Sequence, residues 1–240
     1  MNKRGADLMR FYRLLDELAA LTGGTRRLAT ASADDIWPRR GVVWFYERGE
    51  ERAQSGQGPR IVRVATHALK AGLTSSLWDR LAADRTPAHR GSQFRGLIGL
   101  ALCEKLGAAA PTTWGRGTTL EAAAREAKLD LAAAEKQEAP IEAAVGMFVG
   151  QMPFVFLSVD DEAGPHSQRA FIEKNSIALL SNFARTSVDE ASSAWLGRQC
   201  PREKVRQSGL WHTQHVDEAY DPSFLETMKS CIQEMRTTWV

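Results

Sequence analysis

The sequence predicts an α+β protein with a small, mainly antiparallel sheet of three strands flanked by helices. Only three short runs, 41–47, 61–66 and 153–159, are rich in β-branched and aromatic residues. Apolar residues at helical spacing occupy much of the remaining chain. Three strands are too few for a doubly wound sheet, and they suit a small sheet covered by helices.

Each element follows from a local pattern. An amphipathic helix is predicted over 7–21, where leucines recur at helical spacing and the pair Gly23 and Gly24 ends the run. The runs 41–47 and 61–66 are separated by a Gly/Pro-rich loop, which is typical of a hairpin. Further helices are predicted from residue 74 onward and at 92–106, 141–150, 167–183 and 222–235.

The chain is predicted to consist of three parts. Residues 1–36 form an N-terminal helix and connector, and residues 37–185 form the core. The core carries an insertion at about 107–140, whose Ala-, Glu- and Lys-rich segment 108–139 we expect to be helical and largely solvated. Residues 186–240 form a helical C-terminal extension that packs its aromatic residues on the core.

Composition narrows the functional classes. The 31 basic and 29 acidic residues give a net charge of +2, so any phosphate-binding surface must come from local clustering of charge. Three widely spaced cysteines argue against a disulfide framework and a zinc knuckle, and they fit a reducing cytoplasm. We find no signal peptide and no apolar run that spans a bilayer, so no membrane partner is expected.

Four elements with chemically useful residues follow one another along the chain. The first strand begins at Gly41, the second is followed by His67, a helix carries Arg80 between leucines, and a later helix carries Glu173. This order resembles the GIY-YIG nuclease superfamily. In that family a Gly-Ile-Tyr strand pairs with a Tyr-Ile-Gly strand, a Leu-x-x-Arg-Leu helix follows, and a glutamate on a later helix completes the site. The resemblance covers about residues 41–183.

The resemblance implies a metal-dependent endonuclease that hydrolyses DNA phosphodiester bonds, in restriction or phage defence. Glu173 is then the ligand of Mg²⁺ or Mn²⁺, and Arg80 clamps the scissile phosphate, because a guanidinium meets phosphate oxygens in a fork geometry. His67 is a candidate general base, since an unperturbed histidine titrates near neutral pH. The residues expected to contact nucleic acid are Arg63, Lys70, His89, Arg90 and Asn182.

The chain departs from the family pattern at both tyrosines. Val43 and Arg63 stand where the family has tyrosine, and Ala65 stands where it has glycine. Tyr46 lies at an odd offset from Val43, so we expect it on the opposite face of the strand. The lost tyrosines motivate a second hypothesis, a catalytically impaired module that binds nucleic acid or a partner protein in a larger complex.

A third hypothesis is a scaffold or regulatory protein without a nucleic-acid role, which the near-neutral charge allows. DNA is the expected partner under the first hypothesis, and a homo-oligomer or a partner protein is left open. No Walker A loop, Rossmann fingerprint or GxSxG elbow points to another class of enzyme.

Two weaker signals lie in the last third of the chain. His212 and His215 are three residues apart, which would place them on one face of a helix as metal ligands, although an aromatic tail packed on the core explains the segment as well. A basic stretch interleaved with tryptophans either follows a DNA backbone or is a solvated loop. Its members are Arg185, Arg198, Arg202, Lys204 and Arg206.

Overall fold

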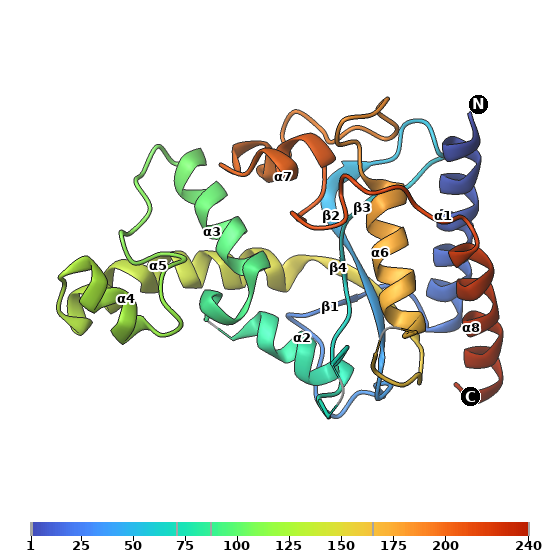
Figure 1. The fold of residues 1–240 in the computed structure, drawn as a ribbon, viewed down its shortest axis with the longest axis horizontal. Helices are drawn as coiled ribbons and strands as arrows, with labels where there is room; N and C mark the ends of the chain where they lie inside the picture. The colour runs from blue at the N-terminus through green and yellow to red at the C-terminus, as the bar shows by residue number, and fades with distance from the viewer. Residues whose placement is uncertain (1, 71, 87, 165, 240) are drawn as a thin grey trace.

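The computed structural model describes residues 2–70, 72–86, 88–164 and 166–239. It is an α+β structure in which helices surround a small antiparallel sheet, so the predicted class is confirmed (Figure 1). The sheet contains one strand more than predicted, because a two-residue strand has too few residues to show a pattern. The strands, in the spatial order β1-β4-β2-β3, are β1 (Arg26–Arg27), β2 (Gly41–Glu51), β3 (Pro59–Ala65) and β4 (Pro153–Ser158).

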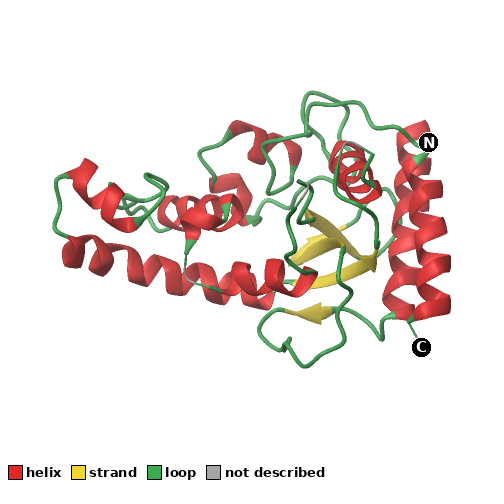
Figure 2. Ribbon diagram, turned by 60° about the horizontal axis from the view of Figure 1, so that its bottom comes forward, coloured by secondary structure: helices red, strands yellow, loops and turns green. Residues whose placement is uncertain are grey.

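Most of the predicted helices are found, with ends that differ by a few residues. The α-helices are α1 (Lys3–Leu21), α2 (Leu77–Arg85), α3 (Gln93–Lys105), α4 (Leu120–Ala127), α5 (Leu131–Gln151), α6 (Gln168–Leu180), α7 (Glu203–Ser208) and α8 (Phe224–Thr238). Two short 3₁₀ helices, η1 (His89–Gly91) and η2 (Leu196–Gln199), complete the set. Helices α1 and α8 lie side by side along one flank, while α4 and the outer half of α5 extend from the opposite side (Figures 1 and 2).

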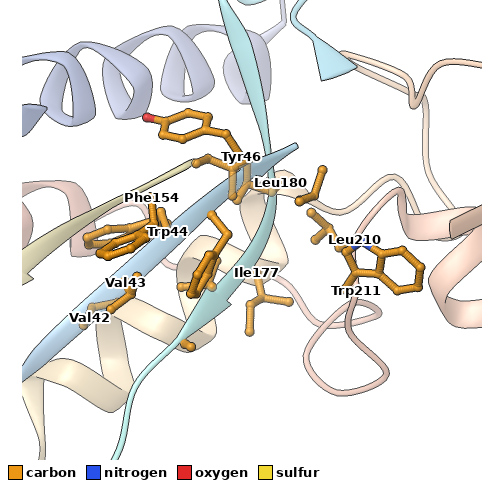
Figure 3. Close-up of a cluster of buried hydrophobic side chains, with 14 of the residues drawn as sticks. Val42, Val43, Trp44, Tyr46, Phe154, Ile177, Leu180, Leu210 and Trp211 are labelled. Carbon is orange, nitrogen blue, oxygen red and sulfur yellow. The ribbon is translucent and has the colours of Figure 1, made fainter. Parts of the chain in front are cut away.

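Strand β2 is the centre of the core because both of its faces are buried. The indole Nε1 of Trp44 donates to Ser176 Oγ of α6 at 3.3 Å, whereas the ring of Phe45 lies 6.3 Å from that of Phe94 on α3. Successive side chains therefore point to helices on opposite sides of the sheet. This explains why the first half of the strand, residues 42–46, is continuously apolar (Figure 3).

The insertion differs from the prediction in two ways. Residues 108–119 form turns rather than a helix, and the helix predicted at 141–150 is the second half of the 21-residue helix α5, which continues through Pro140. Proline lacks the N–H that bonds the preceding turn, so a helix interrupted there needs support from packing. Glu138 and Glu142 supply it, because both carboxylates are buried and pair with arginines of neighbouring elements.

Within the described residues, none of the helices combines the length and the hydrophobicity that crossing a membrane requires. The three cysteines are free and buried, in agreement with the prediction that they do not form a disulfide framework. The fold therefore depends on side-chain packing and hydrogen bonds rather than on covalent cross-links.

Gly41 begins β2 at a point where the chain passes very close to β4. A Cβ atom at this position would lie 2.3 Å from the backbone oxygen of Leu157, and a backbone atom cannot move aside as the end of a side chain can. The glycine of the motif is thus required by the pairing of β2 with β4 at Gly41 and Ser158.

We expect Gly41→Ala to lower the free energy of unfolding by about 3 kcal/mol, because the added methyl group overpacks the sheet. Urea unfolding measures this loss. The matched control is Gly146→Ala in α5, where a Cβ meets nothing within 4 Å and where replacing glycine in a helix stabilises by about 1 kcal/mol. Equal effects of the two substitutions would contradict the close approach.

Candidate functional site

The outer edge of β3 brings together side chains from two distant parts of the chain. The backbone N–H of Val64 donates to Nε2 of His212 at 2.9 Å, and the N–H of Thr66, next to the end of β3, donates to Oε1 of Glu173 at 3.2 Å. Residues two apart in an extended strand are separated by about 7 Å and point their N–H groups to the same side. The imidazole and the carboxylate therefore lie next to each other along one sheet edge.

The segment that carries His212 is fixed to the core by tryptophans. The N–H of Trp211 donates to Val62 O of β3 at 2.8 Å. The indole Nε1 atoms of Trp211 and Trp195 both donate to Oε2 of Glu47, each at 3.0 Å. Burial raises the pKa of Glu47 to about 7, although the two indole hydrogen bonds act in the opposite direction.

Glu173 lies in the first half of α6, whose N-cap Ser167 accepts a hydrogen bond from the N–H of Ala170. Burial raises the pKa of the Glu173 carboxyl, and the positive charge of Arg63 and the hydrogen bond from Thr66 partly offset this effect. The carboxylate is thus a partly buried acid whose charged form needs cations beside it.

Arg80 approaches the same place from α2, which begins with a capping box between Ser76 and Asp79. Its Nη2 atom lies 3.2 Å from Oδ1 of Asp84, one turn further along the helix. Asp84 is fully buried and also accepts a hydrogen bond from Ser92 Oγ at 2.8 Å. Because Asp84 holds the guanidinium, Arg80 keeps a defined position although its side chain is 21% exposed.

Arg63 of β3 completes the group and is buried, with its guanidinium carbon 4.0 Å from the ring centre of Phe94. Burial lowers the pKa of Arg63 to about 10, while the charges of Asp84 and Glu173 act to raise it. We call Arg63, Arg80, Asp84 and Glu173 the Glu173 cluster. It combines two positive and two negative charges from three separate elements.

His67 lies beside this cluster but is poorly suited to act as a base. Its Nε2 atom is 3.3 Å from the carbonyl oxygen of Arg39, and its Nδ1 atom is buried without a hydrogen bond to any described residue. Burial lowers the pKa of His67 to about 4, and the charges of Arg169 and Arg80 contribute to the decrease. The ring is neutral at physiological pH, and its predicted role stays a prediction.

The residues expected to contact nucleic acid are dispersed. Lys70 is exposed in the loop before α2, and Arg63 is part of the Glu173 cluster. Asn182, just after α6, is buried and bonds the backbone N–H and C=O of Val188 at 2.9 and 3.0 Å. Asn182 therefore serves the loop that follows it.

His89 and Arg90 are engaged within the protein. Both ring nitrogens of His89 are used: Nδ1 bonds Glu142 at 2.7 Å and Nε2 accepts the N–H of Gly115 at 2.9 Å. Arg90 forms a two-pronged ion pair with Glu138, with both distances 2.7 Å. These contacts hold η1 against α5, outside the Glu173 cluster.

No tyrosine takes over the missing motif positions. The chain has three tyrosines, and all belong to α1 or lie against it. Tyr12 is part of α1, and the hydroxyl of Tyr220 donates to Asp7 of α1 at 2.8 Å. Burial raises the pKa of Tyr46, and the nearby Tyr12 and Asp16 of α1 raise it further. Tyr46 therefore lies on the α1 side of β2, opposite the face of Phe45.

Two site residues were missed by the sequence analysis. Asp84 had a usable signal, because it stands four residues after Arg80 in a helix, where opposite charges meet. For the segment of His212 the sequence offered either a metal ligand on a helix or an aromatic tail packed on the core. The helix is wrong, since residues 212–221 form no helix and His215 has φ +62°, whereas the buried Trp211 agrees with the packed tail. Within the described ranges, no group of three or more His, Cys, Asp and Glu side chains is arranged to hold a metal ion.

The geometry is that of a small sheet whose edge presents an arginine and a glutamate from two flanking helices. The family model described as "GIY-YIG domain" matches residues 2–238. The chain belongs to this family. Membership implies nuclease activity in general, and GIY-YIG nucleases act on DNA. No curated protein and no solved structure gives a significant match.

We expect Asp84→Asn to lower the free energy of unfolding by about 3 kcal/mol, because it leaves buried positive charge without its counter-charge. Urea unfolding measures the change. The control is Glu126→Gln in the exposed Arg116–Glu126 pair, where the expected loss is below about 1 kcal/mol. Similar losses in both variants would show that Asp84 does not neutralise the cluster.

A pH dependence follows from Glu47, whose pKa rises from an ordinary value of 4.5 to about 7 on folding. Between these values the folded protein holds a proton that the unfolded chain has lost, so stability falls as pH rises through this window and is constant above it. Relative to Glu47→Gln, the wild type should lose on the order of 2 kcal/mol between about pH 4.5 and about pH 8. Parallel stability curves from urea unfolding of the two proteins would refute this assignment.

Proposed function

We propose that the protein is an endonuclease that hydrolyses phosphodiester bonds of DNA with the help of Mg²⁺ or Mn²⁺. The observation that carries the proposal is the convergence of Arg80 and Glu173 in a chain that matches the GIY-YIG domain over residues 2–238. The prediction that this activity serves restriction or phage defence rests on the resemblance alone.

The donor set fits a single hard cation. Glu173 uses Oε1 for the N–H of Thr66, and its partly buried carboxylate forms no ion pair with a described residue. Mg²⁺ is often held by one or two carboxylates, with water and substrate phosphate oxygens as the remaining ligands. Such an ion supplies positive charge for the developing charge on the leaving oxygen.

Arg80 is the phosphate clamp. Its ion pair with Asp84 fixes the side chain, and its partial exposure leaves donors for a substrate. A guanidinium binds two phosphate oxygens at once, so it holds the scissile group and stabilises its charge in the transition state. Arg63 adds a second positive charge to the Glu173 cluster but stays buried against Phe94.

His212 orients groups at the reaction centre rather than removing a proton. Because its Nε2 accepts the N–H of Val64, its proton resides on Nδ1, which makes the ring a neutral donor toward a phosphate or a water. Burial lowers the pKa of His212 well below its usual value, so the ring keeps this form at neutral pH. Because His67 is poorly suited to act as a base, solvent is the activating base for the attacking water.

Cleavage of supercoiled plasmid tests the proposal. Wild-type protein with Mg²⁺ or Mn²⁺ should nick or linearise the plasmid, and chelation should stop the reaction. Glu173→Gln, which keeps an acceptor for the N–H of Thr66 and loses the charge, should lower the rate at least about 100-fold, as should Arg80→Ala. Glu226→Gln on α8, whose side chain is 64% exposed, is the matched control and should cleave normally.

Two results would contradict the proposal. One is a wild-type protein that binds DNA with the help of Arg80 but cleaves no DNA with either metal, which would favour the non-catalytic module. The other is Glu173→Gln with full activity, which would remove the proposed metal ligand from the mechanism.

A further inference from the structure

A hollow of about 520 Å³ opens at the C-terminal end of α6, and three arginines line it. Arg185 comes from the loop after α6, Arg198 from η2 and Arg206 from α7. We call this hollow the arginine groove. These elements follow one another at the upper end of α6 in Figure 1.

The positive charge of the groove is not neutralised by acidic partners. Glu190 is the single acidic residue among the described residues that line it, against three arginines, and none of the three forms an ion pair with a described carboxylate. Other arginines of the chain do form such pairs, for example Arg60 with Glu50 at 2.7 Å. The groove therefore has an excess of positive charge that an anionic ligand would neutralise.

Backbone carbonyl groups hold the three guanidinium groups in place. Arg185 Nη1 donates to Ala178 O at 2.8 Å, Arg198 Nε to Ser192 O at 2.6 Å, and Arg206 Nη1 to Cys200 O at 2.6 Å. Arg206 uses only Nη1 in contacts with described residues, so its Nε and Nη2 donors are left for a ligand. Because the guanidinium groups are already oriented, less entropy is lost when an anion binds.

The groove is connected to the Glu173 cluster. Gly209 lines the groove and directly precedes the segment that places His212 on β3, and Arg185 Nη2 donates to Glu218 O of the same segment at 3.0 Å. The seven residues from Glu173 to Leu180, the last residue of α6, correspond to about 10 Å along the helix, and Asn182 of the groove lies two residues further on. With an axial rise of about 3.4 Å per nucleotide, this corresponds to a few nucleotides along one strand of a duplex.

We propose that the arginine groove binds the phosphate backbone of substrate DNA a few nucleotides from the scissile phosphate. This inference extends the proposed function, since it names a second contact of the same substrate. Contacts of this kind fix the position of the duplex without reading its sequence.

Fluorescence anisotropy with a labelled duplex of about 30 base pairs tests the inference, over a range of about 50 to 300 mM KCl. EDTA is present, so that binding is measured without cleavage. In the double variant Arg198→Gln/Arg206→Gln, the slope of log K against log salt concentration should decrease by about 2, and the affinity should fall about tenfold for any sequence.

The matched control removes the same charge elsewhere. Arg10→Gln/Arg236→Gln changes two arginines of α1 and α8 that pair with Glu226 and Glu17, and it should leave the slope unchanged. Arg198→Lys/Arg206→Lys keeps the charge and should restore most of the slope. A thermal melt of each variant shows whether it is folded, and the lysine variant keeps the test valid if the glutamine variant is not.

The outcomes separate the two proposals. An unchanged slope in the glutamine variant, or equal decreases in it and in the control, would overturn the arginine groove even if the protein cleaves DNA. A decrease confined to the groove variant, in a protein that never cleaves, would support the groove and overturn the nuclease. A wild-type protein without measurable affinity for DNA would overturn both.

Discussion

The exposed edge of β3 is the constraint on which the site depends. A strand at the edge of a sheet leaves every second N–H and C=O without a strand partner, and proteins must cover such an edge or risk pairing with other chains. Here the carbonyl of Val62 and the N–H groups of Val64 and Thr66 bond a backbone N–H, an imidazole and a carboxylate. The cover of the edge is therefore also the source of Glu173 and His212. A substitution that loosened the C-terminal segment would expose the edge and disturb the site together.

Buried ion pairs connect this edge to the extended part of the molecule. Arg95 of α3 pairs with Glu142 of α5 at 2.6 Å and also donates to the carbonyl of Asp84 at 2.7 Å. Burial acts to raise the pKa of Glu142, but hydrogen bonds from His89 and Arg95 outweigh it and hold the pKa at about 2. Since the carboxylate of Asp84 in turn holds Arg80, a continuous set of ion pairs and hydrogen bonds runs from α5 through Arg95 and the backbone carbonyl of Asp84 to Arg80. Helix α5 thus supports the site although it contributes no residue to the Glu173 cluster.

Sequence patterns predicted what is local and missed what depends on contacts between distant segments. Strands β2, β3 and β4 follow from short β-branched runs, and the choice of Arg80 and Glu173 as candidate site residues follows from the order of the motifs. The continuity of α5 through Pro140 was missed, because the breaking effect of proline is local and the ion pairs that offset it are not. The contact of His212 with Val64 joins residues 148 positions apart. Spacing within a segment carries no information about such a contact.

The replacement of a motif tyrosine by Arg63 changes the charge of the site. The two arginines and two carboxylates of the Glu173 cluster add up to zero, whereas a neutral tyrosine at position 63 would leave a net charge of −1. A neutral cluster attracts a divalent cation less strongly and a phosphate more strongly than a negative one does. Under the proposed function, the DNA phosphate must therefore supply part of the negative charge that retains the cation. The cation and the scissile phosphate then bind to the Glu173 cluster together, and free protein holds the cation only weakly.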